Sequence, residues 1–201
     1  INGVILDKQD APAAEIAWRR RHGWWLWWRH ATFGCVAGSV RLGGREVAGE
    51  PAHRVARLGL GYVPEERRIF PDISVLDNLR LGLKAPPQGR NARWTIETIL
   101  DHFPHLRERC RQIAGTLSGG EQQMLTLGRT LLGNPDVVLV DEPTEGLAPV
   151  IVEQVQRLLR RMQEAGLGVL LVEQSFDFVR DMASRAYVMG KGRMVFEGAL
   201  A

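Results

Sequence analysis

The stretch LSGGEQQMLTLGRTLLGNPDVVLVDEPT, residues 117–144, contains the signals that decide the fold. Its first part predicts a helix, because Ser118 and Glu121 have the spacing of a capping box ahead of a hydrophobic run. Its second part holds a continuous apolar run, 137–140, that ends in two acidic residues. Such a run is typical of a strand buried on both faces. A helix followed by a buried strand favours an α/β domain with a parallel sheet.

Helices and strands alternate on both sides of this stretch. Turn residues, caps and the period of the apolar residues mark their bounds. The predicted strands lie at 39–47 (two short strands around a Gly-Gly turn), 58–63, 136–142, 168–173, 185–189 and 193–197. The predicted helices lie at 51–57, 74–83, 94–102, 104–113, from 118 onward, from 149 to 166 and at 175–182. Strands that alternate with helices predict helices packed on the faces of a parallel sheet.

The composition is that of an ordinary globular domain. The chain has 201 residues, of which 45% are hydrophobic and 24% charged. This excludes a disulfide-stapled mini-protein, a disordered tail and a fibrous repeat. The cysteines, Cys35 and Cys110, allow at most one disulfide, which favours a reducing compartment. The sequence has no run of about 18 apolar residues, so we expect no membrane span.

The net charge of +3 comes from one short segment. Residues 18–30 contain Arg19, Arg20, Arg21 and Arg29 without an acidic residue and therefore carry +4, which leaves 3 − 4 = −1 for the rest. A nearly neutral remainder argues against a nucleic-acid partner.

Residues 1–38 do not fit the pattern of the rest of the chain. Five of the six tryptophans lie between Trp18 and Trp28, with neither a helical nor a strand period. Trp and Arg together suit a membrane interface or a nucleic-acid surface. The alternative, which we favour, is a segment translated out of frame, because GC-rich DNA read out of frame encodes much Trp, Arg, Gly and Ala.

Two motifs predict chemistry. The helix that begins at Ser118 has Gly119 and Gly120 in its first turn, so its backbone N–H groups are uncovered and attract an anion. The alternative is a capped helix without a ligand. The second motif is the strand ending in Asp141 and Glu142, at the edge where open α/β sheets bind ligands. Asp141 could hold Mg²⁺ and Glu142 could act as a general base, whereas the alternative is two solvated acids.

Together these motifs resemble those of one family. TLSGGEQQ (116–123) is similar to the signature motif of ABC-type ATPases, VVLVDEPT (137–144) to their Walker B strand and EGLA (145–148) to their D-loop. Residues 39–201 therefore resemble the ATP-binding subunit of an ABC transporter. GYVPEERRIFPDISVLDNLRLGL (61–83) and LLVEQSFDF (170–178) are most similar to the branched-chain amino acid importers, with the urea importer ATPase close behind.

The resemblance implies a fold and a division of the chain. The fold is the P-loop NTPase (ABC ATPase) fold, with a parallel sheet core, a helical signature subdomain at about 72–133 and an incomplete N-terminal part. On this division 1–38 is a non-matching segment and 39–201 a partial ABC ATPase domain.

The resemblance also implies roles for individual residues. Two such domains pair head to tail, and the signature residues Ser118, Gly119, Gly120 and Glu121 then bind the ATP held by the partner. Within the chain, the residues that line the nucleotide and its Mg²⁺ follow the ends of predicted strands. They are Glu65 at the Q-loop position, Asp141 on Mg²⁺, Glu142 as the base and Gln174 at the switch position.

One motif of that family has no match in the sequence. The phosphate-binding loop, G-x-x-x-x-G-K-[ST], does not occur in these residues. INGV (1–4) resembles the middle of such a loop, but Lys8 neither follows Gly nor precedes Ser or Thr. We expect a reading-frame disruption after Val4, with the true frame restored near Gly38 or Ser39.

The implied function is that of an ATP-binding and ATP-hydrolysing subunit of an importer for branched-chain amino acids. Its partners would be a second ATPase subunit, identical or different, and integral membrane permease subunits. Its place would be the cytoplasmic face of the bacterial inner membrane, as a peripheral subunit. The alternatives are an inactive, non-enzymatic remnant of such a subunit, a urea importer ATPase, or an ABC ATPase without a transport role.

Overall fold

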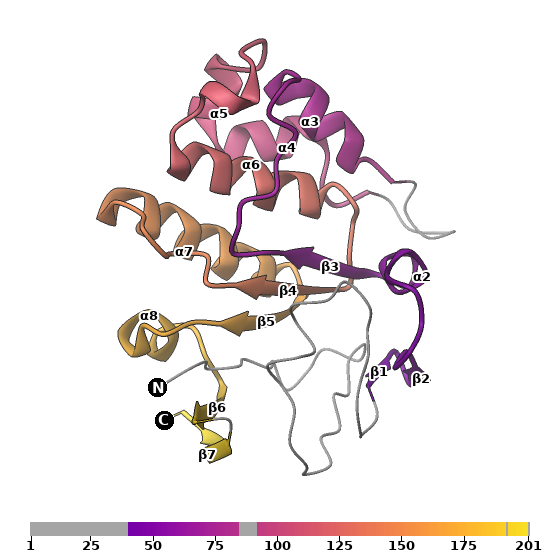
Figure 1. The fold of residues 1–201 in the computed structure, drawn as a ribbon, viewed down its shortest axis with the longest axis vertical. Helices are drawn as coiled ribbons and strands as arrows, with labels where there is room; N and C mark the ends of the chain where they lie inside the picture. The colour runs from indigo at the N-terminus through magenta and orange to yellow at the C-terminus, as the bar shows by residue number, and fades with distance from the viewer. Residues whose placement is uncertain (1–39, 85–91, 192, 201) are drawn as a thin grey trace.

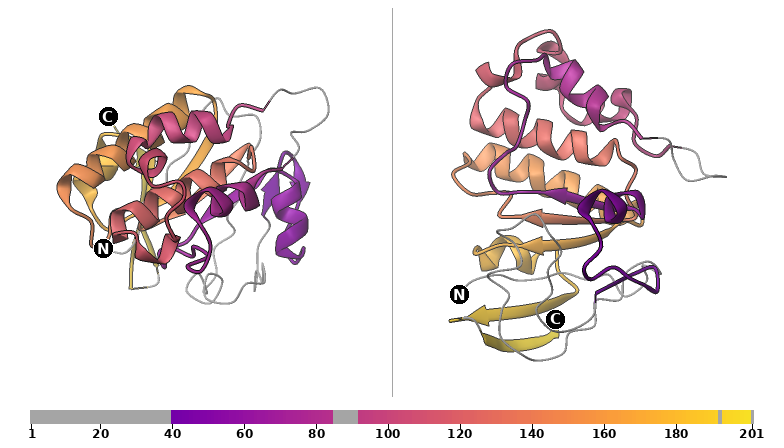
Figure 2. Two further views of the ribbon diagram at one scale, coloured as in Figure 1. Left: turned by 90° about the horizontal axis from the view of Figure 1, so that it is seen from above. Right: turned by 45° about the vertical axis from the view of Figure 1, so that its right-hand side comes forward.

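The computed structural model describes residues 40–84, 92–191 and 193–200. The interpretations of residues 1–38 therefore lie outside the described residues. Within them, a central layer of strands separates a group of helices from a small hairpin, which lie at opposite ends of the long axis (Figure 1). The right-hand view of Figure 2 shows the same order of layers.

Three parallel strands form the central sheet, as predicted. They are β3 (Leu60–Val63), β4 (Val137–Asp141) and β5 (Gly168–Val172), in the order β3-β4-β5. All five residues of β4 are buried because this strand is paired on both sides and covered on both faces. The parallel pairing brings the carboxyl ends of all three strands to one edge of the sheet.

The helices begin within two residues of their predicted starts. They are α2 (Ala52–Arg57), α3 (Val75–Gly82), α4 (Ile96–His102), α5 (Pro104–Glu108), α6 (Gly119–Leu131), α7 (Pro149–Glu164) and α8 (Phe176–Arg180), with a 3-10 turn at Ala114–Thr116. Ser74 accepts a hydrogen bond from the backbone of Asp77, and Ser118 forms a reciprocal capping box with Glu121. The predicted start of α6 at Ser118 is therefore confirmed.

Two antiparallel hairpins complete the described strands. The first joins β1 (Arg41–Leu42) to β2 (Arg45–Glu46) through Gly43 and Gly44, whose φ angles of 57° and 76° explain the Gly-Gly turn. The second pairs β6 (Arg185–Gly190) with β7 (Arg193–Ala199).

The prediction of a helix over 104–113 is wrong in its length, because α5 ends at Glu108. The residues that follow α5 instead form hydrogen bonds with the start of α3. The carbonyl of Cys110 accepts from the backbone N–H of Leu76, and that of Gln112 accepts from Val75. These are N–H groups of the first turn of α3, which have no partner inside their own helix. A continued α5 would have withdrawn the carbonyls that satisfy them.

The helices pack at close range through glycines. A Cβ at Gly82, the last residue of α3, would overlap the carbonyl oxygen of Arg129 on α6. A Cβ at Gly128 of α6 would lie 2.6 Å from Cγ2 of Ile99 on α4. Both glycines let backbones approach where a side chain would hold them apart.

Helix α7 lies between the sheet and the group of helices α3 to α6 (Figure 1) and contacts that group near both of its ends. At its start, a Cβ at Gly120 would be 3.0 Å from Ile151, so α6 and α7 touch there. At its end, Arg161 Nη1 lies 2.8 Å from His102 Nδ1, and Arg93 Nη1 donates to the carbonyl of Ala165 at 2.7 Å. Burial and the charge of Arg161 lower the pKa of His102, which favours the neutral ring that can accept from Arg161.

Among the described residues, every helix is too short or too polar to span a bilayer.

Candidate functional site

Three residues named from the sequence lie just past the ends of the three parallel strands. Glu65 follows β3 after one proline, Glu142 follows β4, and Gln174 follows β5 after one intervening residue. Their proximity is a product of the topology, because parallel strands present their carboxyl ends to the same edge of the sheet.

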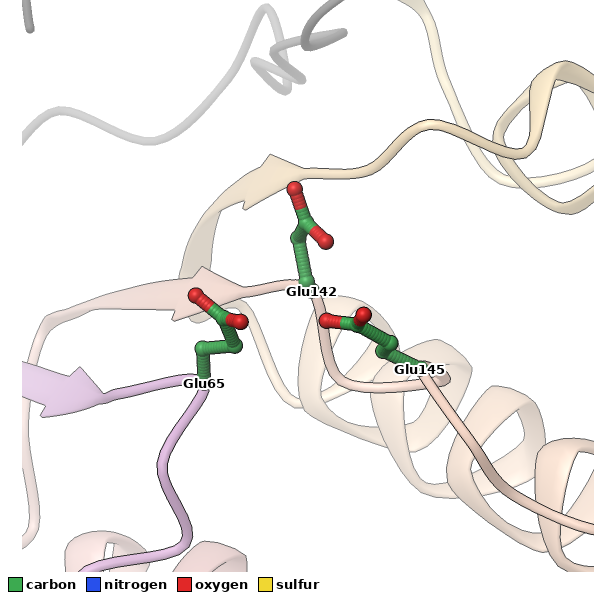
Figure 3. Close-up of side chains that lie close together, drawn as sticks. All are labelled: Glu65, Glu142 and Glu145. Carbon is green, nitrogen blue, oxygen red and sulfur yellow. The ribbon is translucent and has the colours of Figure 1, made fainter.

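The structure brings these residues into direct reach of one another. Gln174 Nε2 donates to Glu142 Oε1 at 2.8 Å. Carboxylate oxygens of Glu65, Glu142 and Glu145 all lie within 4.8 Å of one another. Figure 3 shows the three side chains side by side past the strand ends. A carboxylate that accepts from an amide at the carboxyl edge of a parallel sheet is suited to holding and polarising a water molecule.

The backbone of Glu142 is held in an uncommon conformation. Its φ is 40°, in the left-handed region that a residue with a side chain seldom adopts. Its N–H donates to the carbonyl of Val172 at 2.9 Å, so β5 holds the strand end in place. Conformations of this kind cost on the order of 1–3 kcal/mol and gather at functional sites. From this position the Glu142 side chain reaches Gln174.

The donor atoms at this edge match the requirements of a divalent cation. Mg²⁺ prefers oxygen ligands, and the three glutamates supply carboxylate oxygens within a single small region. Asp141, which the sequence interpretation assigns to Mg²⁺, is the last residue of β4 and is 6% exposed. It lies directly beside Glu142 in the chain, and its role toward the metal stays a prediction.

The signature residues begin α6. Ser118 Oγ accepts from the N–H of Glu121, while Glu121 Oε2 accepts from Ser118 N at 2.9 Å and from Ser118 Oγ at 2.7 Å. Arg109 Nε lies 3.0 Å from Glu121 Oε1. Burial raises the pKa of Glu121, but the bonds from Ser118 and the charge of Arg109 outweigh it and lower the pKa overall. The carboxylate of Glu121 thus organises the helix start from within the chain, and its predicted contact with nucleotide remains a prediction.

Arg67 joins the signature helix, α6, to the acidic edge, which is the group of Glu65, Glu142 and Glu145 past the strand ends. The sequence did not reveal this role. Its Nη2 donates to the carbonyl of Glu145 at 2.9 Å, and its guanidinium fills the space where a Cβ at Gly119 would stand. The doublet Arg67-Arg68 resembles any solvated basic loop, so only the folded chain shows this contact.

A second pair was also missed, although a signal for it exists. Glu173 is 3% exposed, and its Oε1 accepts from both the backbone N and the hydroxyl of Thr144, at 3.1 and 2.5 Å. An acid directly after the apolar run of β5 is the signal, because a carboxylate so close to a buried strand needs internal donors.

The chain is similar to known proteins in sequence and in fold. The ABC transporter family model matches residues 31–145. The chain is 40% identical over 160 residues to the high-affinity branched-chain amino acid transport ATP-binding protein BraG of Pseudomonas aeruginosa, covering 80% of this chain and 68% of that protein. It is 34% identical over 163 residues to the probable branched-chain amino acid transport ATP-binding protein LivF of Archaeoglobus fulgidus, covering 81% and 69%. A solved nucleotide-free ATP-binding cassette from an ABC transporter shares the fold, with a TM-score of 0.67 and 22% identity over 84% of this chain and 72% of that one.

Proposed function

The chain belongs to the ABC transporter family, and from that premise we propose that it is an ATP-binding subunit that drives an importer by ATP hydrolysis. The observation that carries the proposal is the hydrogen bond between Gln174 and Glu142 beside two further carboxylates, at the carboxyl edge of a parallel sheet. We propose branched-chain amino acids as the cargo because the relatives BraG and LivF are named for that transport.

Each residue of the edge has a task in the proposed reaction. Glu142 accepts a proton from the attacking water, which a carboxylate held by an amide donor is placed to do. Gln174 orients Glu142 and donates to the γ-phosphate, and Glu65 lines the same side of the nucleotide. Asp141 would hold Mg²⁺, which neutralises charge on the β- and γ-phosphates when it is bound.

The signature helix serves the nucleotide of a second subunit. The N–H groups of Gly119 and Gly120 and the hydroxyl of Ser118 stand at the positive end of the 13-residue helix α6. In the proposed head-to-tail pair they contact the γ-phosphate of ATP held by the partner ATPase subunit. Glu121 supports them by keeping Ser118 in its capping conformation.

The loop after β3 offers a surface for the permease. Asn78 is fully buried, and it holds the backbone of Phe70 through two bonds of 2.9 Å, donating to its carbonyl and accepting from its N–H. The Phe70 side chain is nevertheless 51% exposed. An aromatic ring held outward on a rigid loop is a natural anchor in a protein interface. We propose that it meets an integral membrane subunit, with this chain peripheral on the cytoplasmic face of the inner membrane.

A second candidate follows from the missing phosphate-binding loop. The 201 residues contain no G-x-x-x-x-G-K-[ST] motif, whose amides and lysine supply most phosphate contacts in this family. The candidate is an inactive remnant of the subunit. A urea importer ATPase and an ABC ATPase without a transport role differ from the main proposal in cargo and partner.

ATP hydrolysis by the chain, purified in complex with permease subunits and a partner ATPase subunit, tests the proposal. Glu142→Gln keeps the shape and the acceptor for Gln174 but removes the base, so we expect hydrolysis to fall by about 10²–10⁴-fold while ATP still binds. Glu153→Gln, an exposed glutamate on α7, is the matched control and should keep full activity.

The same assay separates the candidates. Equal hydrolysis by Glu142→Gln and the parent would remove Glu142 from the mechanism. No hydrolysis by the parent assembly would favour the inactive remnant. Uptake of leucine but not urea into proteoliposomes would support the proposed cargo.

A further inference from the structure

A buried carboxylate ties the loop after β4 to the residue that follows β5. Glu173 is 3% exposed and lies at the end of β5, directly before Gln174. Both of its oxygens are acceptors. Oε1 receives the N–H and the hydroxyl of Thr144, and Oε2 receives the backbone N–H of Gln174 at 3.2 Å. Three donors offset the cost of burying a charged group, so the carboxylate holds all three in fixed positions.

These contacts close a ring around the reactive pair. From Glu142 the chain runs two residues to Thr144, which bonds Glu173, and Glu173 fixes the backbone of Gln174. The side chain of Gln174 then returns to Glu142 at 2.8 Å. The loop is itself firm, because Glu145 N donates to the carbonyl of Glu142 and Leu147 N to that of Thr144. A displacement of Thr144 therefore reaches Gln174 through one buried group.

We propose that Glu173 is a positioning residue that transmits the position of the loop at 144–148 to the Gln174–Glu142 pair. The part of this inference that concerns catalysis rests on the proposed function. When the loop moves, the Glu173 carboxylate moves with the Thr144 hydroxyl, and the amide of Gln174 shifts relative to Glu142. The pair is then aligned for hydrolysis only when the loop is in the position seen here.

Amide hydrogen exchange in the full chain without nucleotide tests the link directly. Thr144→Val removes the hydroxyl and keeps the shape, whereas Thr144→Ser keeps the hydroxyl. We expect the amide of Gln174 to exchange about tenfold faster in Thr144→Val, the factor for losing one charged hydrogen bond. Thr144→Ser should match the parent. Thr126→Val is the control, because the hydroxyl of this buried threonine bonds only within α6 among the contacts found, to the carbonyl of Gln122.

Two outcomes would overturn the proposal. One is faster exchange confined to residues 144–147 with Gln174 unchanged, which is what a local packing role of Thr144 produces. The other is Thr144→Ser exchanging as fast as Thr144→Val. If Thr144→Val does not fold, Glu173→Gln replaces it, because an amide nitrogen in place of Oε2 cannot accept from Gln174. Its Gln174 amide should exchange about tenfold faster, and an unchanged rate would refute the link.

The catalytic consequence has a separate readout. In the assembled transporter, Thr144→Val should lower kcat with little change in KM for ATP, and Thr144→Ser should restore kcat, because the link aligns groups without binding nucleotide. The exchange experiment uses no ATP. A chain that never hydrolyses ATP would defeat the proposed function and leave the exchange result standing, so the two failures are distinguishable.

Discussion

At the scale of single residues, the acidic edge depends on one strained backbone and one amide. Glu142 adopts a φ of 40° and is held there by the N–H bond to Val172. Gln174 donates to it and, by resemblance, occupies the switch position, where the family commonly has histidine. An amide can donate as a histidine does, but it cannot gain a proton near neutral pH. The pair is therefore insensitive to pH on the Gln174 side.

Gln174→His should add a dependence on pH that the parent lacks. An imidazole titrates with an ordinary pKa of about 6.5, so its ability to donate to Glu142 and to carry charge changes between about pH 5.5 and 7.5. We expect the profile of ATP hydrolysis by the assembled transporter to gain a step in this range. Superimposable profiles for the parent and the variant would contradict this expectation.

The sequence predicted the site residues that follow strand ends and missed those held by long-range bonds. The resemblance to the family named Glu65, Glu142 and Gln174, and the structure brings them together because parallel strands end at one edge of the sheet. The Arg67–Glu145 contact joins residues 78 positions apart, through a backbone carbonyl that no side-chain pattern encodes. Contacts of that kind depend on the path of the folded loop, and they produce no periodic pattern in the sequence.

At the scale of elements, caps and apolar runs placed the helices and strands well, whereas helix ends depended on tertiary contacts. Ser118 marked the start of α6, and the run at 137–140 became the buried strand β4. The end of α5 was missed because it is set by the needs of α3, whose first N–H groups bond to the carbonyls of Cys110 and Gln112. A local pattern cannot encode such a demand from another element.

Gly82→Ala tests the close approach of α3 and α6. The added methyl group would overlap the carbonyl oxygen of Arg129, which is backbone and cannot turn aside. We expect the variant to lose about 1–3 kcal/mol of unfolding free energy, as overpacked sites do. Urea denaturation followed by circular dichroism measures it. Gly190→Ala, whose Cβ would meet Val195 at an ordinary 3.6 Å, should cost less, and equal losses would refute the explanation.

The contact between α4 and α7 should make stability depend on pH. Burial and Arg161 lower the pKa of His102 in the folded state below its unfolded value of about 6.5. The unfolded chain then takes up the proton first, so the stability contributed by neutral His102 is complete above about pH 6.5 and falls as the pH drops through the folded pKa.

His102→Gln keeps an acceptor for Arg161 and cannot titrate. We expect Tm to fall less between pH 7.5 and 5.5 in this variant than in the parent, by differential scanning calorimetry. His53→Gln, at an exposed histidine on α2, should behave as the parent does. Equal losses of Tm in His102→Gln and the parent would show that His102 does not contribute.

At the scale of the whole molecule, the described residues carry the acidic edge and the signature helix but no recognisable phosphate-binding loop. In the proposed head-to-tail pair the two halves of the site would serve different nucleotides, because the signature residues would contact the ATP held by the partner subunit. The chain can thus contribute Ser118 and the N–H groups of Gly119 and Gly120 to a partner even if its own hold on ATP is weak.

Residues 1–201 alone should bind Mg-ATP poorly, since the missing loop would supply the amides and lysine that hold the phosphates. Titration with a fluorescent ATP analogue measures the affinity. Binding by the chain alone in the micromolar range would contradict the prediction. With a partner ATPase that has its own loop, we expect ATP to promote a complex of the two chains by size-exclusion chromatography.

Helix α7 contacts other helical segments near both of its ends. It is pinned to the signature end of α6 where Gly120 meets Ile151, and to the segment around α4 where Arg93 and His102 reach its last turns. A helix that is held near both ends moves when the helices that hold it move. Rotation of these helices over the sheet would therefore have to carry α7 with it or break one of these contacts, so we expect a shift at the start of α6 to reach the last turn of α7.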